Sequence, residues 1–400
     1  MPFKGISPKL HPIKELKNSR VIEIAPDVWE IEGYISTQFF IKPASSNIFI
    51  FRDNDDVLLL DTGLYPYYRK LILDILVKYR KEGAKNLTLL LSQGHFDHAA
   101  NDDIILEAGY DNIRFLLPEM ELETIDLLNH FTGDFRELEK YYNPYSMLPF
   151  LVNLASKISI KFARSLVKKV SKMLFQGINT LVDKAELLLE ESKVTKSIGN
   201  IEFTGWEIGR FFAIHDGTHS PGHISLYDPK NKLIMTGDAT IEINPPFFNS
   251  RLIKSIDVMK KFRQIAEQGY VQIAIDSHHS SKYFKKILKK FNVEPLDSIQ
   301  IADYARGKEQ CISFFSMFEN YYKELKNEVL SALSLLKEAT IPEIMKEFKR
   351  SDNKAVKMKI AMKFPKFPSR LDVLIAVVLD ELKTPWRREG KKVIFESNRN

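Results

Sequence analysis

The sequence predicts an α/β protein, because strand-like apolar runs alternate with helical patterns along much of the chain. A second observation is that side chains able to bind metals gather directly after several of these runs. Seven of the nine histidines fall in three clusters: His95 and His98; His215, His219 and His223; His278 and His279. Histidines scattered over a surface would not group in this way. The sequence therefore predicts an α/β fold with a metal centre at its strand ends.

The strand-like runs before position 118 are short and apolar, and turn residues separate them. In order they are 28–31, 47–51, 57–60, 87–91 and 113–117. A helical pattern over 65–85 separates the third run from the fourth, and a second helix is expected near 101–108. The third run ends at Asp61-Thr62-Gly63, and the fourth ends at the ligand-rich turn 92–98.

The segment 119–191 has no strand signal, and its apolar residues recur at helical spacing from Leu151 to Met173. The opposite face of this pattern carries six Lys and Arg side chains with no acid between them. We expect a helical insertion at 119–191. Its apolar stripe either packs on the main body with the lysines in water, or covers the active site as a lid.

Strand signals return between Ile201 and Ala239 and are followed by a helix over 252–267. The next strand, 271–275, ends at Asp276-Ser277-His278-His279. The ligand clusters thus lie at strand ends in two α/β halves on either side of the insertion. We expect residues 1–118 and 192–300 to form one catalytic domain.

Residues 301–400 are expected to form a third part. A helix over 321–337 precedes Thr340-Ile341-Pro342-Glu343, which is a capping box with proline at the helix start. A helix over 369–382 and a hairpin turning at Glu389-Gly390 complete a winged-helix-like pattern. Such modules bind nucleic acid or serve in dimerisation and packing. If this part serves recognition only, removal of the residues after Asn320 would spare hydrolysis of small substrates.

The basic charge of the chain is concentrated in this last part. Residues 341–400 carry fifteen Lys and Arg against eight Asp and Glu, and the whole chain has a net charge of +6. This surplus can attract nucleic acid, an anionic membrane or an acidic partner. It can equally be a lysine-rich surface in water.

The composition restricts the class of protein. With 44% hydrophobic and 28% charged residues, the chain resembles ordinary soluble domains. The single cysteine, Cys311, excludes an internal disulfide and a thiolate-rich zinc site. We expect no secretory signal in the first twenty residues, which are polar, and no spanning helix, because no apolar run approaches roughly eighteen residues. We therefore expect a cytoplasmic protein.

Five motifs occur in an order and spacing that resemble the metallo-β-lactamase superfamily. They are Asp61-Thr62-Gly63, Ser92-Gln93-Gly94-His95-Phe96-Asp97-His98, Thr218-His219-Ser220-Pro221-Gly222-His223, Thr236-Gly237-Asp238 and Ser277-His278. The resemblance covers roughly residues 20–290. It implies a four-layer αββα sandwich with the metal centre at one edge.

The resemblance also implies the ligand set. It places His95 and His219 at one metal, with Gln93 as a third candidate through its amide oxygen. Its second metal is held by Asp97, His98 and His278, with His279 as the alternative to His278, and Asp238 bridges both metals. The family normally has histidine where this chain has Gln93. Because an amide oxygen is a weaker ligand than imidazole, we expect the first site to bind less tightly.

The positions of the remaining residues beside these ligands suggest their roles. Asp97 and His223 are the expected catalytic residues, with His223 and His215 orienting ligands or contacting substrate. Asp61 is expected to orient the ligand turn, or to cap a strand end. The expected cofactor is one or two Zn²⁺ ions, with iron or manganese as alternatives.

The predicted metal site indicates hydrolysis by a metal-activated water, and the resemblance implies an ester, thioester or lactone as the substrate. Apolar residues in the insertion and at 243–248 favour a small, lipophilic substrate. One alternative is a phosphodiesterase or ribonuclease that holds nucleic acid with the basic tail. Another is a regulator that binds metal or DNA without catalysis. Homo-oligomer formation is compatible with each of these.

Overall fold

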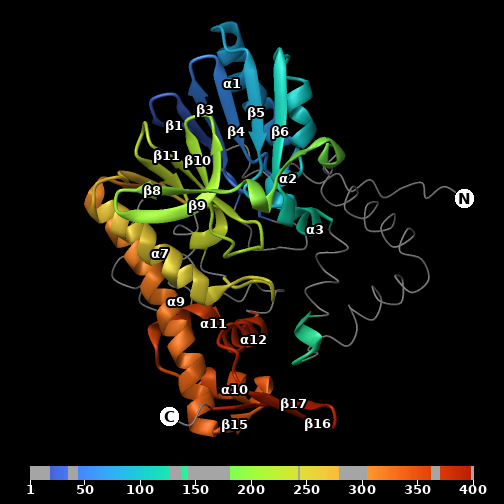
Figure 1. Ribbon diagram of the computed structural model, residues 1–400, viewed down its shortest axis with the longest axis vertical. Coiled ribbons are helices and arrows are strands. Elements are labelled where there is room, and N and C mark those ends of the chain that lie inside the picture. Colours follow the sequence, from blue (N-terminus) through green and yellow to red (C-terminus); the bar gives the residue numbers. More distant parts are fainter. Residues whose placement is uncertain are drawn as a thin grey trace, which may run out of the picture. The chain divides into compact units, whose positions relative to one another are not determined.

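The computed structural model describes residues 19–34, 44–126, 137–142, 181–241, 244–278, 304–361 and 370–397. The chain divides into two compact units (Figure 1). The first unit comprises residues 1–130 and 151–190, and the second comprises residues 131–150 and 191–400. Both units combine a mixed sheet with helices, which confirms the predicted α/β class.

The first unit is built on a seven-stranded sheet whose order follows the sequence. Its strands are β1 (Val21–Ala25), β2 (Val28–Ile31), β3 (Ile48–Asp53), β4 (Asp56–Leu60), β5 (Asn86–Leu90), β6 (Asn112–Pro118) and β7 (Glu186–Leu188). Strands β1 to β4 pair antiparallel, and β4 to β7 pair parallel. Because β4 and β5 are parallel neighbours, the segments that follow Leu60 and Leu90 leave the sheet at the same edge.

Helix α1 (Tyr67–Lys81) connects β4 to β5. Its buried residues recur every three or four positions, which gives the apolar stripe that packs into the core of this unit: Tyr68, Ile72, Ile75, Leu76 and Tyr79. Basic residues in its last turn suit the negative end of the helix dipole. Shorter helices follow β5 and β6, namely α2 (Phe96–Ala99), a 3₁₀ turn at Asp102–Leu106 and α3 (Leu122–Ile125).

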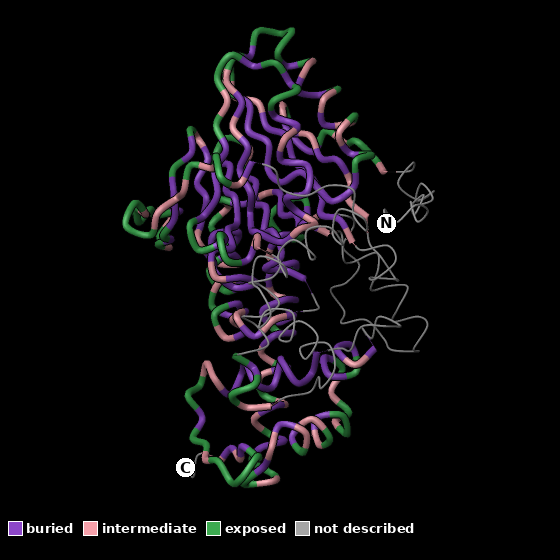
Figure 2. Tube along the Cα trace, turned by 90° about the vertical axis from the view of Figure 1, so that its right-hand side faces the viewer, coloured by how far each residue is buried: buried purple, intermediate pink, exposed green. Residues whose placement is uncertain are grey.

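The second unit contains another seven-stranded sheet, in the order β14-β13-β12-β11-β10-β9-β8. Its strands are β8 (Val194–Ile198), β9 (Ile201–Ile208), β10 (Phe211–His215), β11 (Ile224–Asp228), β12 (Leu233–Met235), β13 (Ile273–Ile275) and β14 (Ala305–Arg306). Helix α7 (Leu252–Glu267) makes the crossover between β12 and β13, which pair parallel. Buried residues, purple in Figure 2, fill the central strands of both sheets.

The C-terminal helices share the core of the second unit. They are α9 (Lys308–Leu336), α10 (Ile341–Phe348), α11 (Lys354–Ala361) and α12 (Leu371–Glu381). Strands β15 (Glu338–Ala339), β16 (Trp386–Glu389) and β17 (Lys392–Glu396) form a small sheet in the order β15-β17-β16. The predicted capping box at Thr340 and Glu343 and the hairpin at 386–396 are confirmed. Assignment of this region as a winged helix stays a prediction, as do the domain boundaries.

Sequence expectation and structure differ at several elements, including β7 and α9. Glu186–Leu188 lies inside the segment expected to lack strands, but it forms β7 beside β6. A three-residue edge strand is too short to show a periodic pattern, which explains why it was missed. Helix α9 begins at Lys308, thirteen residues before the expected start at 321. The amphipathic stretch Leu151–Met173, the candidate lid, lies outside the described residues.

Among the helices in the described parts of the chain, none combines the length and apolar character that crossing a membrane requires.

Candidate metal centre

The ligand-rich turn of the first unit starts where β5 ends and is fastened to the end of β4. Both carboxylate oxygens of Asp61 accept hydrogen bonds from Ser92, at 2.8 Å from its backbone nitrogen and 2.7 Å from its hydroxyl. Asp61 is buried and has a left-handed backbone with φ of 60°. Residues other than glycine rarely adopt this backbone conformation, so the hydrogen bonds to Ser92 help to hold Asp61 in it. Asp61 thus orients the turn, as its position in the motif suggested.

Asp61 also sets the proton position on His98. The His98 Nδ1 atom lies 2.8 Å from Asp61 Oδ2, and both side chains are buried. Because a carboxylate only accepts hydrogen bonds, Nδ1 carries the proton and Nε2 keeps its lone pair. A neutral histidine held in this way is suited to bind a cation through Nε2.

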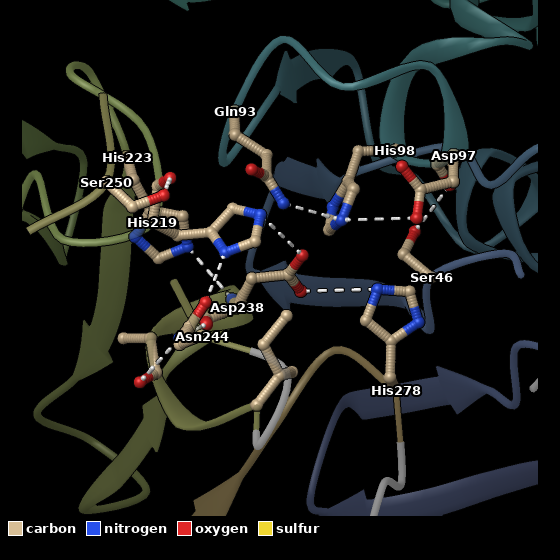
Figure 3. A network of polar contacts seen from close by, with 12 residues as sticks. Ser46, Gln93, Asp97, His98, His219, His223, Asp238, Asn244, Ser250 and His278 are labelled. Carbon is tan, nitrogen blue, oxygen red and sulfur yellow. Dashed lines mark hydrogen bonds and ion pairs between the residues drawn. The ribbon is translucent and has the colours of Figure 1, made fainter. Parts of the chain in front are cut away.

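Gln93 contacts the same His98 nitrogen. Its amide nitrogen lies 2.7 Å from His98 Nε2, and Gln93 is buried (Figure 3). With Nδ1 protonated, the Gln93 amide donates to the lone pair of Nε2. The structure therefore places Gln93 against a predicted ligand, as a hydrogen-bond donor to it.

Helix α2 presents the other two residues of the motif. His95 is the N-cap of α2 and is buried, whereas Asp97 in its first turn is half-buried. Asp97 Oδ2 lies 4.0 Å from His98 Nε2. The backbone of the preceding glycine is held by a residue that the sequence did not single out, because the Gly94 nitrogen donates to buried Glu121 Oε2 at 2.7 Å.

Gly94 is required by this close approach. A Cβ atom at position 94 would lie 2.7 Å from the backbone nitrogen of Ile125 and 2.8 Å from the Glu121 carbonyl oxygen. Glu121 is 27 positions from Gly94 and had no local signal that could have identified it.

Asp238 is the centre of the corresponding group in the second unit. Its Oδ2 lies 3.3 Å from His219 Nε2, and its Oδ1 lies 3.3 Å from His278 Nε2 (Figure 3). Asp238 and His219 are buried, and His278 is partly exposed. One carboxylate therefore faces two imidazoles, and this arrangement is suited to a bridging ligand.

His223 lies behind Asp238 and is fully buried. Its Nδ1 is 2.7 Å from Asp216 Oδ1, and its Nε2 accepts the backbone N–H of Asp238 at 2.9 Å. Burial alone would raise the pKa of Asp216, but the contact with His223 and hydrogen bonds from Ser225 and Thr218 lower it. His223 therefore holds the turn that carries Asp238.

Gly237 lets this turn pass close to the His223 ring. Its φ is +54°, and a Cβ atom there would lie 2.5 Å from His223 Nε2. The glycine of Thr236-Gly237-Asp238 thus has a steric explanation.

His215 stands apart from this group. Its Nδ1 lies 2.7 Å from Lys193 Nζ, and its Nε2 lies 2.8 Å from the Pro221 carbonyl oxygen. Burial lowers the pKa of His215, and the charges of Lys193 and Lys254 act in the same direction. The contacts with Lys193 and Pro221 engage both ring nitrogens. His279, the alternative to His278, lies outside the described residues.

The residues present fit a divalent cation. Among the described residues, six His and Asp side chains are candidates to hold a metal ion: His95, Asp97, His98, His219, Asp238 and His278. Neutral imidazole with carboxylate is a donor set typical of zinc, iron and manganese sites. Both His98 and His219 have Nδ1 against a buried oxygen acceptor, which leaves Nε2 for a ligand.

Comparisons with known proteins agree with these observations. Residues 172–296 match the family described as the metallo-beta-lactamase superfamily. No curated protein is similar enough in sequence to match the chain.

Solved structures with the same fold cover most of the chain. A β-lactamase domain protein from Burkholderia ambifaria has a TM-score of 0.53 at 14% identity, over 94% of this chain and 93% of that one. A metallo-β-lactamase family protein from Thermus thermophilus has a TM-score of 0.50 at 14% identity, over 94% of this chain and 100% of that one.

A third similar structure is the inverting sec-alkylsulfatase Pisa1 from Pseudomonas sp., with a TM-score of 0.52 at 15% identity. The likeness covers 91% of this chain but 50% of Pisa1, so the chain spans about half the length of that enzyme. These structures show the fold, and the matched family includes the His219, Asp238 and His278 motifs. Residues 172–296 are thus similar to the metallo-beta-lactamase superfamily, and the solved structures share the fold over most of the chain.

Proposed function

We propose that the chain, as a metallo-hydrolase of this superfamily, holds one or two divalent cations with the ligand set that the motifs define. Its members would be His95, Asp97, His98, His219, Asp238 and His278, with Gln93 as a further candidate. The observation that carries the proposal is the Asp238 carboxylate, whose two oxygens each lie 3.3 Å from a different imidazole. Zinc suits this mixture of donors, with iron and manganese as alternatives.

Bound cations would lower the pKa of a water molecule toward neutrality and polarise the bond that is cleaved. The chain would supply orientation and proton transfer. Asp97, half-buried in the first turn of α2, would orient the water molecule and accept its proton. His223 would act indirectly, because both its ring nitrogens are engaged by Asp216 and the Asp238 backbone.

We propose an ester, thioester or lactone with a lipophilic part as the substrate. The segment after the Asp238 turn supports this choice, because it carries an apolar side chain, Phe247, that is partly exposed. Ser250, which follows closely, donates from its hydroxyl to the His219 carbonyl oxygen at 2.7 Å. The segment that carries Phe247 is thereby tied to the backbone of a predicted ligand. Sulfate esters join the candidates, since the similar Pisa1 is named as an alkylsulfatase.

A nucleic-acid substrate finds less support in the described residues. Arg387 in the terminal hairpin is hydrogen-bonded to three carboxylates, those of Glu338, Glu389 and Glu396. A basic side chain shared among three acids offers little charge to a phosphate backbone. Arg387 would therefore contribute little to nucleic-acid binding.

The test is metal analysis followed by a substrate panel of lactones, thioesters, sulfate esters, phosphodiesters and RNA. We expect between one and two equivalents of zinc, iron or manganese, and hydrolysis of at least one carboxylic or sulfuric ester that stops in a chelator. Asp238→Ala should remove metal and activity without unfolding the chain, whereas Asp257→Ala on α7 should change neither. Less than half an equivalent of metal together with tight DNA binding would instead support the regulator.

A further inference from the structure

A single buried amide, that of Asn244, contacts two predicted ligands, the ring of His219 and the backbone of Asp238. Its Oδ1 lies 2.7 Å from His219 Nδ1, so it accepts the ring proton and leaves the lone pair on Nε2 (Figure 3). Its Nδ2 donates to the Asp238 carbonyl oxygen at 2.8 Å. Rotation of the Asn244 side chain would therefore disturb the His219 ring and the Asp238 backbone together.

Helix α9 holds this amide from the other side. The hydroxyl of Tyr322, a fully buried residue, lies 3.2 Å from Asn244 Nδ2, whose N–H it accepts. The same hydroxyl is 2.9 Å from the carbonyl oxygens of Ala239 and Ile241, to which it can donate one at a time. Tyr322 thus fixes both the amide and the backbone that follows Asp238.

Helix α11 contributes a third contact. Lys359 is buried, and its Nζ donates to the Asn244 carbonyl oxygen at 2.9 Å. Full burial of a lysine is costly and is uncommon without a polar partner. The Lys359 Nζ atom therefore anchors the Asn244 backbone in the second unit.

We propose that Asn244, Tyr322 and Lys359 are positioning residues of the metal centre, so that α9 and α11 set the geometry of His219 and Asp238. The inference rests on the proposed function, and it assigns these C-terminal helices to the catalytic machinery. Hydrogen-bond partners of metal-binding histidines typically contribute about 10- to 100-fold to metal affinity. A purely structural role would affect stability but leave affinity per folded molecule unchanged.

The experiment measures Co²⁺ affinity by competition with a chelator, together with the Co²⁺ absorption spectrum and the thermal stability of the metal-free chain. Tyr322→Phe removes one hydroxyl and should lower the affinity about tenfold and shift the spectrum. Asn244→Ala should lower it by up to about 100-fold. Asn244→Asp, which keeps an oxygen for His219 Nδ1, should recover part of this loss.

Tyr227→Phe is the matched control. Its hydroxyl is also held by one backbone carbonyl, that of Tyr270 at 3.1 Å, but none of its contacts involves Asn244. We expect a lower melting temperature with wild-type Co²⁺ affinity and spectrum.

Two results would overturn the inference, and they are distinguishable. If the wild-type chain binds Co²⁺ and Asp238→Ala does not, but Tyr322→Phe and Asn244→Ala keep wild-type affinity and spectrum, Asn244 and Tyr322 are structural, the inference fails and the proposed function stands. If the wild-type chain binds no Co²⁺, the metal centre itself is wrong. Should Tyr322→Phe fail to fold, the comparison of Asn244→Asp with Asn244→Ala decides.

Discussion

The side-chain nitrogen of Gln93 lies 2.7 Å from His98 Nε2, the nitrogen that Asp61 leaves without a proton. A cation bound by His98 would have to take the lone pair that Gln93 now occupies. The amide would then turn away or present its oxygen to the cation. The residue that replaces the usual first histidine is therefore a competitor for His98 as much as a candidate ligand.

Substitutions of Gln93 can distinguish a competitor for His98 from a metal ligand. If Gln93 competes, Gln93→Ala should raise metal affinity a few-fold, since removing one hydrogen bond changes a free energy by about 1 kcal/mol. Gln93→His should raise the affinity for one metal equivalent about tenfold or more, because imidazole is a better metal ligand than an amide. Chelator competition measures both variants. A tenfold loss in Gln93→Ala would show instead that its oxygen is a ligand.

Asp61 should matter through His98 and not through contact with metal. Asp61→Asn keeps the size of the side chain but replaces one acceptor oxygen by a donor, so one of the contacts to Ser92 and His98 is lost. We expect metal affinity to fall about 10- to 100-fold. Asp56→Asn is the control, because Asp56 is exposed at the other end of β4 and holds Asn86. Equal affinity in the two variants would contradict the orienting role.

Gly237→Ala should damage the Asp238 turn. The added Cβ would meet His223 Nε2 at 2.5 Å and would also force alanine to a φ of +54°. The strained backbone alone costs about 1 kcal/mol, and the clash adds to it. Gly209→Ala isolates the first effect, because its φ is +57° and nothing lies within 4 Å of its Cβ.

Denaturant unfolding and metal binding compare the two glycine variants. We expect Gly209→Ala to lower stability without affecting metal binding. Gly237→Ala should lower stability further and lose most of its bound metal. If both variants bind metal as the wild type does, the contact between Gly237 and His223 is unimportant for the centre.

Much of the fold could be read from the sequence, because its signals are local. The helix expected over 252–267 is α7, and the motifs after Leu60 and Leu90 follow neighbouring parallel strands. The residues that were missed act over long distances along the chain. Asn244 reaches Tyr322, 78 positions away, and Lys359, 115 positions away. No local pattern reports such contacts, and Asn244 resembled part of an apolar loop.

The charge of Lys359 should make stability depend on pH. Burial lowers its pKa to about 7, and nearby Arg370 acts in the same direction while Asp372 opposes it. Between about pH 7 and the ordinary lysine pKa near 10.4, the unfolded chain binds more protons than the folded chain. The stability contributed by this residue therefore rises with pH across that window and is lowest below pH 7.

Lys359→Met removes this dependence, so its stability relative to the wild type should be most favourable near pH 6 and decline by pH 9. The difference in unfolding free energy between variant and wild type should change across this pH range by at most roughly 1.4 kcal/mol for each unit of pKa shift. Lys357→Met, an exposed change on the same helix, should show no such trend. Parallel curves for the Lys359→Met variant and the wild type would mean that Lys359 titrates normally.

Removal of the residues after Asn320 should abolish hydrolysis, in contrast to what a recognition module would allow. The cut divides α9, whose buried residues Leu325 and Val329 belong to the same core as α7 and the second sheet. It also removes Tyr322 and Lys359 from Asn244. A point substitution in α9 tests its contribution to the core of the second unit without removing any residues. Leu325→Ala should cost about 2 to 5 kcal/mol of unfolding free energy and lower the melting temperature of the whole second unit.

Leu335→Ala on the same helix is the control for that loss. Leu335 is 69% exposed, so its truncation should change stability by less than about 0.5 kcal/mol. A chain ending at Asn320 that keeps wild-type activity and metal content would show that the C-terminal helices do not support the centre. We expect the opposite, because one buried hydroxyl on α9 lies within 2.9 Å of both carbonyls that follow Asp238.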